Sequence, residues 1–139
     1  MAVTTAGTVA LADIRPLAAA ALEPSGAGDP DVLVDIVDSP SPPVLMLEWD
    51  DPWLEAGPGM ATMGPCTYQS RLRVVCIATR LVPGAGIATL EGLVAYVLGR
   101  MRSDPYTWAL VSVQAPAQRD WSGVDYLVAN VLYAVQTSI

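Results

Sequence analysis

The segment Tyr126–Val135 constrains the fold more than any other part of the chain, because it predicts a β-strand that is apolar on both faces. Side chains alternate across a strand. One face carries Leu127, Ala129, Val131, Tyr133 and Val135, and the other carries Tyr126, Val128, Leu132 and Ala134, with Asn130 as the polar exception. A sheet with two apolar faces needs a covering layer on each side. The predicted helices suffice for one layer, so we expect another copy of the protein to cover the second face.

Length and composition favour one domain over residues 1–139 that hides part of its surface against partners. A chain of this length buries roughly two-thirds of its unfolded surface. Hydrophobic residues make up 53% of it and charged residues 15%, against roughly a quarter charged in average proteins. The net charge of −7 and the pI near 4.2 argue against a nucleic-acid-binding surface, which needs clustered Lys and Arg.

Hydrophobic periodicity predicts an α+β fold, with a mixed or antiparallel sheet of four to five strands and two helices packed on one face. The boundaries follow from proline and glycine breaks and from changes in period. We expect a helix over 13–22, two strands within 31–49, a long loop over 50–66, a strand over 68–80, a helix over 88–102 and a terminal hairpin over 107–136.

The residue types that carry most enzyme chemistry are missing, so we expect no enzyme, no cofactor and no metal site. Without histidine the chain lacks the commonest general base and the usual partner of a serine or cysteine nucleophile. Cys66 and Cys76 match no zinc spacing. The aspartates at positions 29, 31, 35 and 38 and the Asp50–Asp51 pair are more typical of a solvated edge than of a metal site.

No stretch reaches the roughly 18 to 20 uncharged residues that a membrane span needs, and the first residues do not form a signal peptide. We therefore expect a soluble protein that is made in the cytosol.

The segment Glu48–Glu55 contains two tryptophans flanked by carboxylates. One interpretation is a contact arm that docks on a neighbouring subunit. The other is that both indoles fold back on the core of the domain, which has no phenylalanine to supply large rings. The sequence leaves both open.

Three stretches resemble a known family. They are the strand Tyr68–Arg80, the helix Leu90–Leu98, and the closing segment from Asp125–Ala129 through Gln136–Thr137. Their order and local sequence resemble tail terminator proteins of long-tailed bacteriophages, closest to those of phages that infect actinobacteria.

The resemblance implies an α+β subunit that forms a homohexameric ring on the last ring of the tail tube and ends tube growth. Its partners would be further copies of itself, the major tail tube protein and a head-completion (stopper) protein, and DNA would pass through the pore without specific binding. The protein would reside in the virion, at the head-proximal end of the tail. The family defines no catalytic residue. The candidate interface residues are Trp49, Asp50, Asp51, Trp53, Arg71, Arg73, Tyr126, Val128, Asn130 and Leu132.

Two alternatives remain. One is another head–tail connector or tube ring subunit, and the other is a small ligand-binding or peptide-binding module that uses the open face of the sheet. Six copies at −7 each would give a ring of about −42, so we expect an acidic pore along which DNA slides, although salt screens charges beyond roughly 8 Å.

Overall fold

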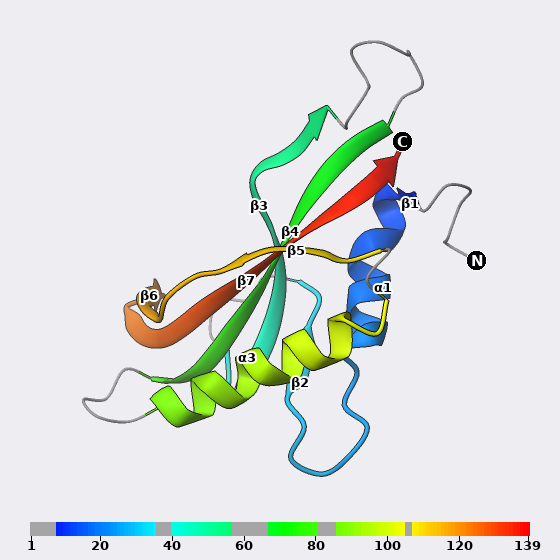
Figure 1. Cartoon of the computed structure of the whole chain (residues 1–139). Coiled ribbons are helices and arrows are strands. Elements are labelled where there is room, and N and C mark those ends of the chain that lie inside the picture. Colours follow the sequence, from blue (N-terminus) through cyan, green and yellow to red (C-terminus); the bar gives the residue numbers. More distant parts are fainter. Residues whose placement is uncertain (1–7, 36–39, 57–66, 81–85, 105–106) are drawn as a thin grey trace.

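A mixed β-sheet is the centre of the computed structural model (Figure 1). The structure describes residues 8–35, 40–56, 67–80, 86–104 and 107–139. Seven strands lie within these residues: β1 Val9–Ala10, β2 Asp31–Leu33, β3 Val44–Ala56, β4 Thr67–Arg80, β5 Ala109–Val113, β6 Ala117–Trp121 and β7 Val124–Ser138. The fold class is therefore α+β as predicted, but the sheet has more strands than the four or five expected.

The last strand, β7, organises the sheet. On one side it pairs antiparallel with β4, from Thr67 opposite Ser138 to Arg80 opposite Tyr126. Its other side pairs with three shorter strands in turn. β6 and β5 are antiparallel to β7, and β1 is parallel to it. The sheet continues from β4 through β3 to β2, which is parallel to β3. β5 therefore lies at one edge of the sheet, and β3 with the short β2 forms the other.

Two helices cover one face of the sheet, which we call the helix face. They are α1 (Ile14–Ala21), which follows a short 3₁₀ turn (Leu11–Asp13), and α3 (Ile87–Met101). Their buried side chains recur at helical spacing and join the alternate residues of the strands in one core: Ile14, Ala18, Leu90, Leu93, Val97, Leu45, Leu47, Leu72, Val74, Val131 and Tyr133. The Tyr96 hydroxyl donates a hydrogen bond of 2.9 Å to the Leu22 carbonyl, which fixes the end of α1 beside α3.

Gly86 begins α3 in a conformation that suits glycine. Its φ is +92°, and its carbonyl accepts a 2.8 Å hydrogen bond from the Leu90 amide. A Cβ at this position would lie 2.5 Å from the Thr79 Cγ2 and 3.1 Å from the Leu127 Cδ2. Asp13 occupies the N-cap position of α1, but its side chain makes no capping hydrogen bond.

Two expected boundaries are wrong. The predicted loop over 50–66 is strand up to Ala56, and its remainder, 57–66, lies outside the described residues. The predicted terminal hairpin over 107–136 holds three strands rather than two, because β6 lies between β5 and β7, and the tight turn into β7 falls at Ser122–Gly123. The long strand over 68–80 and the helix over 88–102 are confirmed to within one residue at each end.

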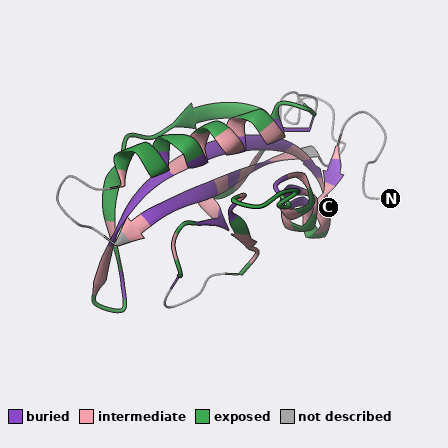
Figure 2. Cartoon of the chain, turned by 90° about the horizontal axis from the view of Figure 1, so that it is seen from below, coloured by how far each residue is buried: buried purple, intermediate pink, exposed green. Residues whose placement is uncertain are grey.

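The expectation that the second face of β7 is uncovered in a single chain is also wrong. Tyr126, Val128 and Leu132, which point away from the helices, are all less than 9% exposed. Figure 2 shows the central strands of the sheet largely purple, as buried, and the outer surface of α3 largely green, as exposed. The need for a second copy on this face, inferred from β7 alone, therefore disappears.

Candidate interaction surfaces

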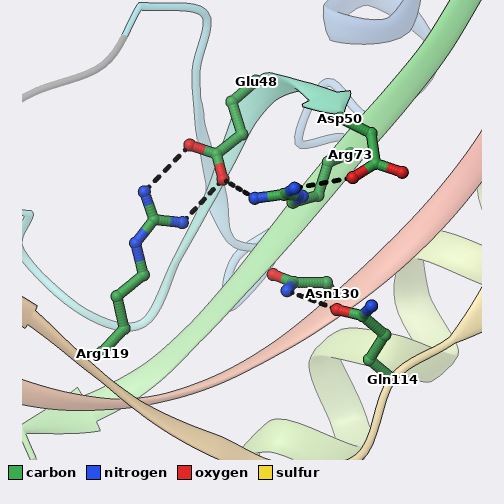
Figure 3. Close-up of polar contacts among 6 residues, drawn as sticks. All are labelled: Glu48, Asp50, Arg73, Gln114, Arg119 and Asn130. Atoms are coloured by element: carbon green, nitrogen blue, oxygen red, sulfur yellow. Dashed lines mark hydrogen bonds and ion pairs between the residues drawn. The ribbon is translucent and has the colours of Figure 1, made fainter. Parts of the chain in front are cut away.

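The opposite face of the sheet carries an ion cluster at its centre, which we call the Glu48 cluster (Figure 3). Glu48 on β3 accepts hydrogen bonds from Arg73 Nη1 at 2.9 Å, from Arg119 Nη1 at 2.6 Å and from Arg119 Nη2 at 3.0 Å. Arg73 Nη2 in turn donates to Asp50 Oδ1 at 2.7 Å. The Glu48 side chain is 5% exposed, whereas Arg73 is 25% and Arg119 is 32% exposed. The cluster thus joins β3, β4 and β6.

Both carboxylates of the cluster are held in the charged form. Burial opposes the ionisation of Glu48, but the hydrogen bonds and charges of Arg119 and Arg73 outweigh it, so its pKa is below the ordinary 4.5. Asp50 has a lowered pKa for the same balance of burial against Arg73. Both groups are therefore charged near neutral pH, and the cluster joins three strands through charge-assisted hydrogen bonds.

The hairpin of β6 and β7 folds over the rest of the opposite face. Trp121 packs edge-on against Tyr126, with ring centroids 5.5 Å apart, and the Arg119 guanidinium lies 4.4 Å above the Trp121 ring. These side chains form a second core with Val128 and with Val75 and Ile77 of β4. The bond from Arg119 to Glu48 closes this hairpin onto β3. This is the physical reason that β7 is buried on both faces within one chain.

The candidate residues on β7 and β4 all contact other residues of the same chain. Tyr126, Val128 and Leu132 are buried within the chain, and Arg73 belongs to the Glu48 cluster. Asn130 donates a 2.8 Å hydrogen bond to the Gln114 side chain. Arg73 Nε and Asn130 Oδ1 are buried and have no hydrogen-bond partner among the described residues.

The candidate residues on distal β3 are more accessible. Trp49 and Trp53 stack with ring centroids 5.3 Å apart. Trp49 packs against the core of the helix face, whereas Trp53 is 47% exposed. Asp51 is exposed, and Arg71 pairs with Glu55 at 2.9 Å. The fold-back interpretation is confirmed for Trp49, whereas Trp53 stays accessible and its docking on a neighbouring subunit remains a prediction.

Among the described residues, the most accessible apolar surface lies on β5, where the sequence predicted no interface residue. Every residue of Ala109–Val113 is exposed, including Leu110, Val111 and Val113, and none is charged. β5 pairs with β7 on one side, and no described strand pairs with its other side. Natural edge strands usually carry charges, proline or bulges that prevent pairing with another chain. β5 has a register shift between Leu110 and Ser112 but neither charge nor proline.

Two apolar hollows run between β5 and α3. The first, of about 350 Å³, is lined mainly by Ile87, Leu90, Val94 and Leu98 of α3 and by Val113 and Pro116. The second, of about 440 Å³, is lined by Leu98, Arg102, Trp108, Ala109, Leu110 and Tyr133. Leu98 lines both, so the two form one apolar groove along the seam. We call β5 and this groove the β5 surface.

The uncharged stretch Ala109–Val113 is the sequence signal that could have identified this surface, because an edge strand without a charge is unusual. Glu48 and Arg119 gave no comparable signal, since they lie 71 positions apart and meet only through the sheet.

The described residues contain no group of three or more metal-ligating side chains. Burial raises the pKa of the Cys76 thiol to about 12, which removes it as a nucleophile near neutral pH. No helix in the described part of the chain is long and apolar enough to cross a membrane. No protein-family model matches the chain, and no curated protein matches it in sequence.

Proposed function

We propose that this chain is a structural subunit that assembles with further copies of itself through the β5 surface. The assembly that we propose is the ring that closes the head-proximal end of a bacteriophage tail tube. The observation that carries the proposal is an uncharged edge strand, every residue of which is exposed, beside an apolar groove. Such an edge is a template for pairing with another chain and favours aggregation unless a partner occupies it.

The specific assembly rests on the resemblance of strand 68–80, helix 90–98 and the closing strand to tail terminator proteins. The observed order of a long strand, a helix and a terminal hairpin is consistent with that resemblance. In this proposal the partners are six-fold related copies, the major tail tube protein and a head-completion protein. DNA only passes through the ring, where the charge of −7 per subunit would repel it.

A second candidate function is supported by the groove itself. A hollow of about 350 Å³ falls within the size range of small-ligand pockets. An apolar ligand or a peptide strand added to β5 would occupy the same surface. A binding module would be a monomer whose thermal midpoint rises with ligand, whereas a ring subunit forms a larger particle. A different connector or tube subunit of the same tail remains the nearest structural alternative.

The test adds purified protein to growing tail tubes and measures tube length by electron microscopy. Wild-type protein should stop growth at the capped end, and Val111→Lys should not, because it places a charge at the centre of the β5 edge. Thr89→Lys is the matched control, since Thr89 is exposed on α3 but lines neither hollow. Tubes that continue to grow beyond bound wild-type protein would refute the terminator function.

A further inference from the structure

The exposed large apolar side chains of the described residues gather mainly at two opposite edges of the sheet. Leu110, Val111 and Val113 lie on β5 at one edge, where Ile87 lines the same groove. Trp53 lies on β3 at the other edge, with about half of its surface accessible. One chain therefore carries an apolar groove at one edge and, at the other, a half-exposed indole that stacks on Trp49.

The distal half of β3 is available as an edge. β2 pairs only with Val44–Met46, so no described strand pairs with the outer side of β3 beyond Met46. This part carries Trp53 together with the exposed carboxylate of Asp51. A partner that receives Trp53 should therefore offer an apolar hollow with a positive charge at its rim.

The hollow at the start of β5 combines apolar walls with a positive charge at its rim. Trp108 and Tyr133 supply aromatic walls, Leu98 and Leu110 supply aliphatic ones, and Arg102 supplies the cation. Arg15, Arg71, Arg73, Arg100 and Arg119 each pair with a carboxylate. Arg102 is exposed at the end of α3 and has no ion pair among the described residues. An arginine beside an aromatic hollow can contact both an indole ring and a carboxylate.

We propose that Trp53 of one copy inserts into the Leu98–Arg102–Trp108–Tyr133 hollow of the next copy, with Asp51 facing Arg102. Distal β3 of the first copy then lies beside the free edge of β5 of the second. This contact joins two different surfaces, so it is heterologous, and repeating it generates a ring or a filament. The inference rests on the proposed self-assembly and adds which two surfaces meet. A symmetric contact of β5 with β5 would leave Trp53 exposed and Arg102 without a carboxylate.

Two single variants and their mixture test the contact by analytical ultracentrifugation. Trp53→Ala removes the indole, and Leu110→Lys blocks the hollow. Each should weaken self-association about 30-fold, as expected for a central aromatic contact. Both residues are exposed, and circular dichroism should confirm that both variants stay folded. Mixed together, the two variants should form dimers but nothing larger, because the mixed pair retains one intact indole and one intact hollow.

A charge reversal tests the polar part of the contact and serves as a second approach if Leu110→Lys fails to fold. Arg102→Glu should weaken association, and adding Asp51→Arg to the same chain should restore it. Thr89→Glu, at an exposed site on α3 that lines neither hollow, is the control: adding Asp51→Arg to it should weaken association, because the new guanidinium would face Arg102.

The outcomes separate this inference from the function on which it rests. Wild-type protein that remains monomeric both alone and on tail tubes overturns the proposed assembly. Wild-type protein that assembles, with Trp53→Ala assembling equally well, overturns only the Trp53 contact. Loss of assembly in Leu110→Lys alone, with no dimers in the mixture, indicates a symmetric β5 contact and also overturns it.

Discussion

Replacing Glu48 with glutamine should destabilise the chain, because this carboxylate closes the terminal hairpin onto β3. It accepts three hydrogen bonds from two arginines at 2.6–3.0 Å. Breaking a fully buried ion pair costs about 3–5 kcal/mol. Both arginines are partly exposed, so water would solvate them once the charge is gone. We therefore expect a loss of about 2–3 kcal/mol in the free energy of unfolding, or a fall of about 7–10 °C in Tm.

The loss of stability in Glu48→Gln should depend on pH, and the direction of that dependence is a second test. Folding lowers the pKa of Glu48 below its ordinary 4.5. Its stabilisation is therefore fully present above that value and is lost as pH falls through the lowered pKa. The stability difference between wild type and Glu48→Gln should thus be constant near neutral pH and shrink below about pH 4.5.

Urea denaturation followed by circular dichroism from pH 3 to pH 7 measures both effects. Glu91→Gln is the matched control, because Glu91 is exposed and makes no ion pair with a described residue. If Glu48→Gln unfolds at the same urea concentration as Glu91→Gln across this range, the cluster does not hold the hairpin and the reasoning is refuted.

Three further changes test other parts of the fold. Trp121→Ala should lower the free energy of unfolding by about 3 kcal/mol, measured by urea denaturation, because it removes the ring that covers Tyr126. A loss below about 1 kcal/mol would contradict the burial of β7 on both faces. Gly86→Ala should lower the free energy of unfolding by about 2–3 kcal/mol, because Gly86 has a positive φ and an added Cβ would meet Thr79. At Gly99 an added Cβ meets nothing within 4 Å, so Gly99→Ala should stabilise the protein by about 0.5–1 kcal/mol. Equal effects of the two substitutions would refute the backbone conformation assigned to Gly86. In a Cys66→Ser background, Cys76 should react with a disulfide reagent at pH 8 only after unfolding, since burial raises its pKa to about 12; rapid reaction of the folded protein would contradict its burial.

The helices and strands with a strong hydrophobic periodicity were predictable from the sequence. The alternation of Leu72, Val74 and Cys76 against Arg73 and Val75 is that of a strand between two different environments, and the structure places the first set under the helices. Helix α3 likewise shows its buried stripe in the spacing of its leucines and valines. Hydrophobic periodicity of this kind is recognised from residues that are close together in the sequence, so it predicts an element without knowledge of its distant contacts.

Distal β3 was not predictable by the same means. Asp50, Asp51 and Pro52 are typical of a loop. The structure keeps them in the strand because the register shifts between Trp49 and Leu54, so Pro52 needs no ladder hydrogen bond. The polar composition of this stretch fits an edge strand as well as it fits a loop.

The covering of the opposite face was missed for a different reason. The sequence correctly predicted two helices, which suffice for one face of the sheet, but a hairpin can cover the other face. β6 places Arg119 and Trp121 on one side and Gln118 and Asp120 on the other. The first pair covers Tyr126 and reaches Glu48, which no local pattern reveals because the partners are far apart in sequence.

Hydrogen–deuterium exchange of the β5 amides tests the central claim most directly. In the monomer, those amides of Ala109–Val113 that do not bond to β7 should exchange quickly, because this edge is exposed. On assembly, alone or on tail tubes, their exchange should slow markedly, while exposed amides of α1 remain unchanged. Unaltered exchange across β5 in the assembled particle would show that the subunits meet elsewhere.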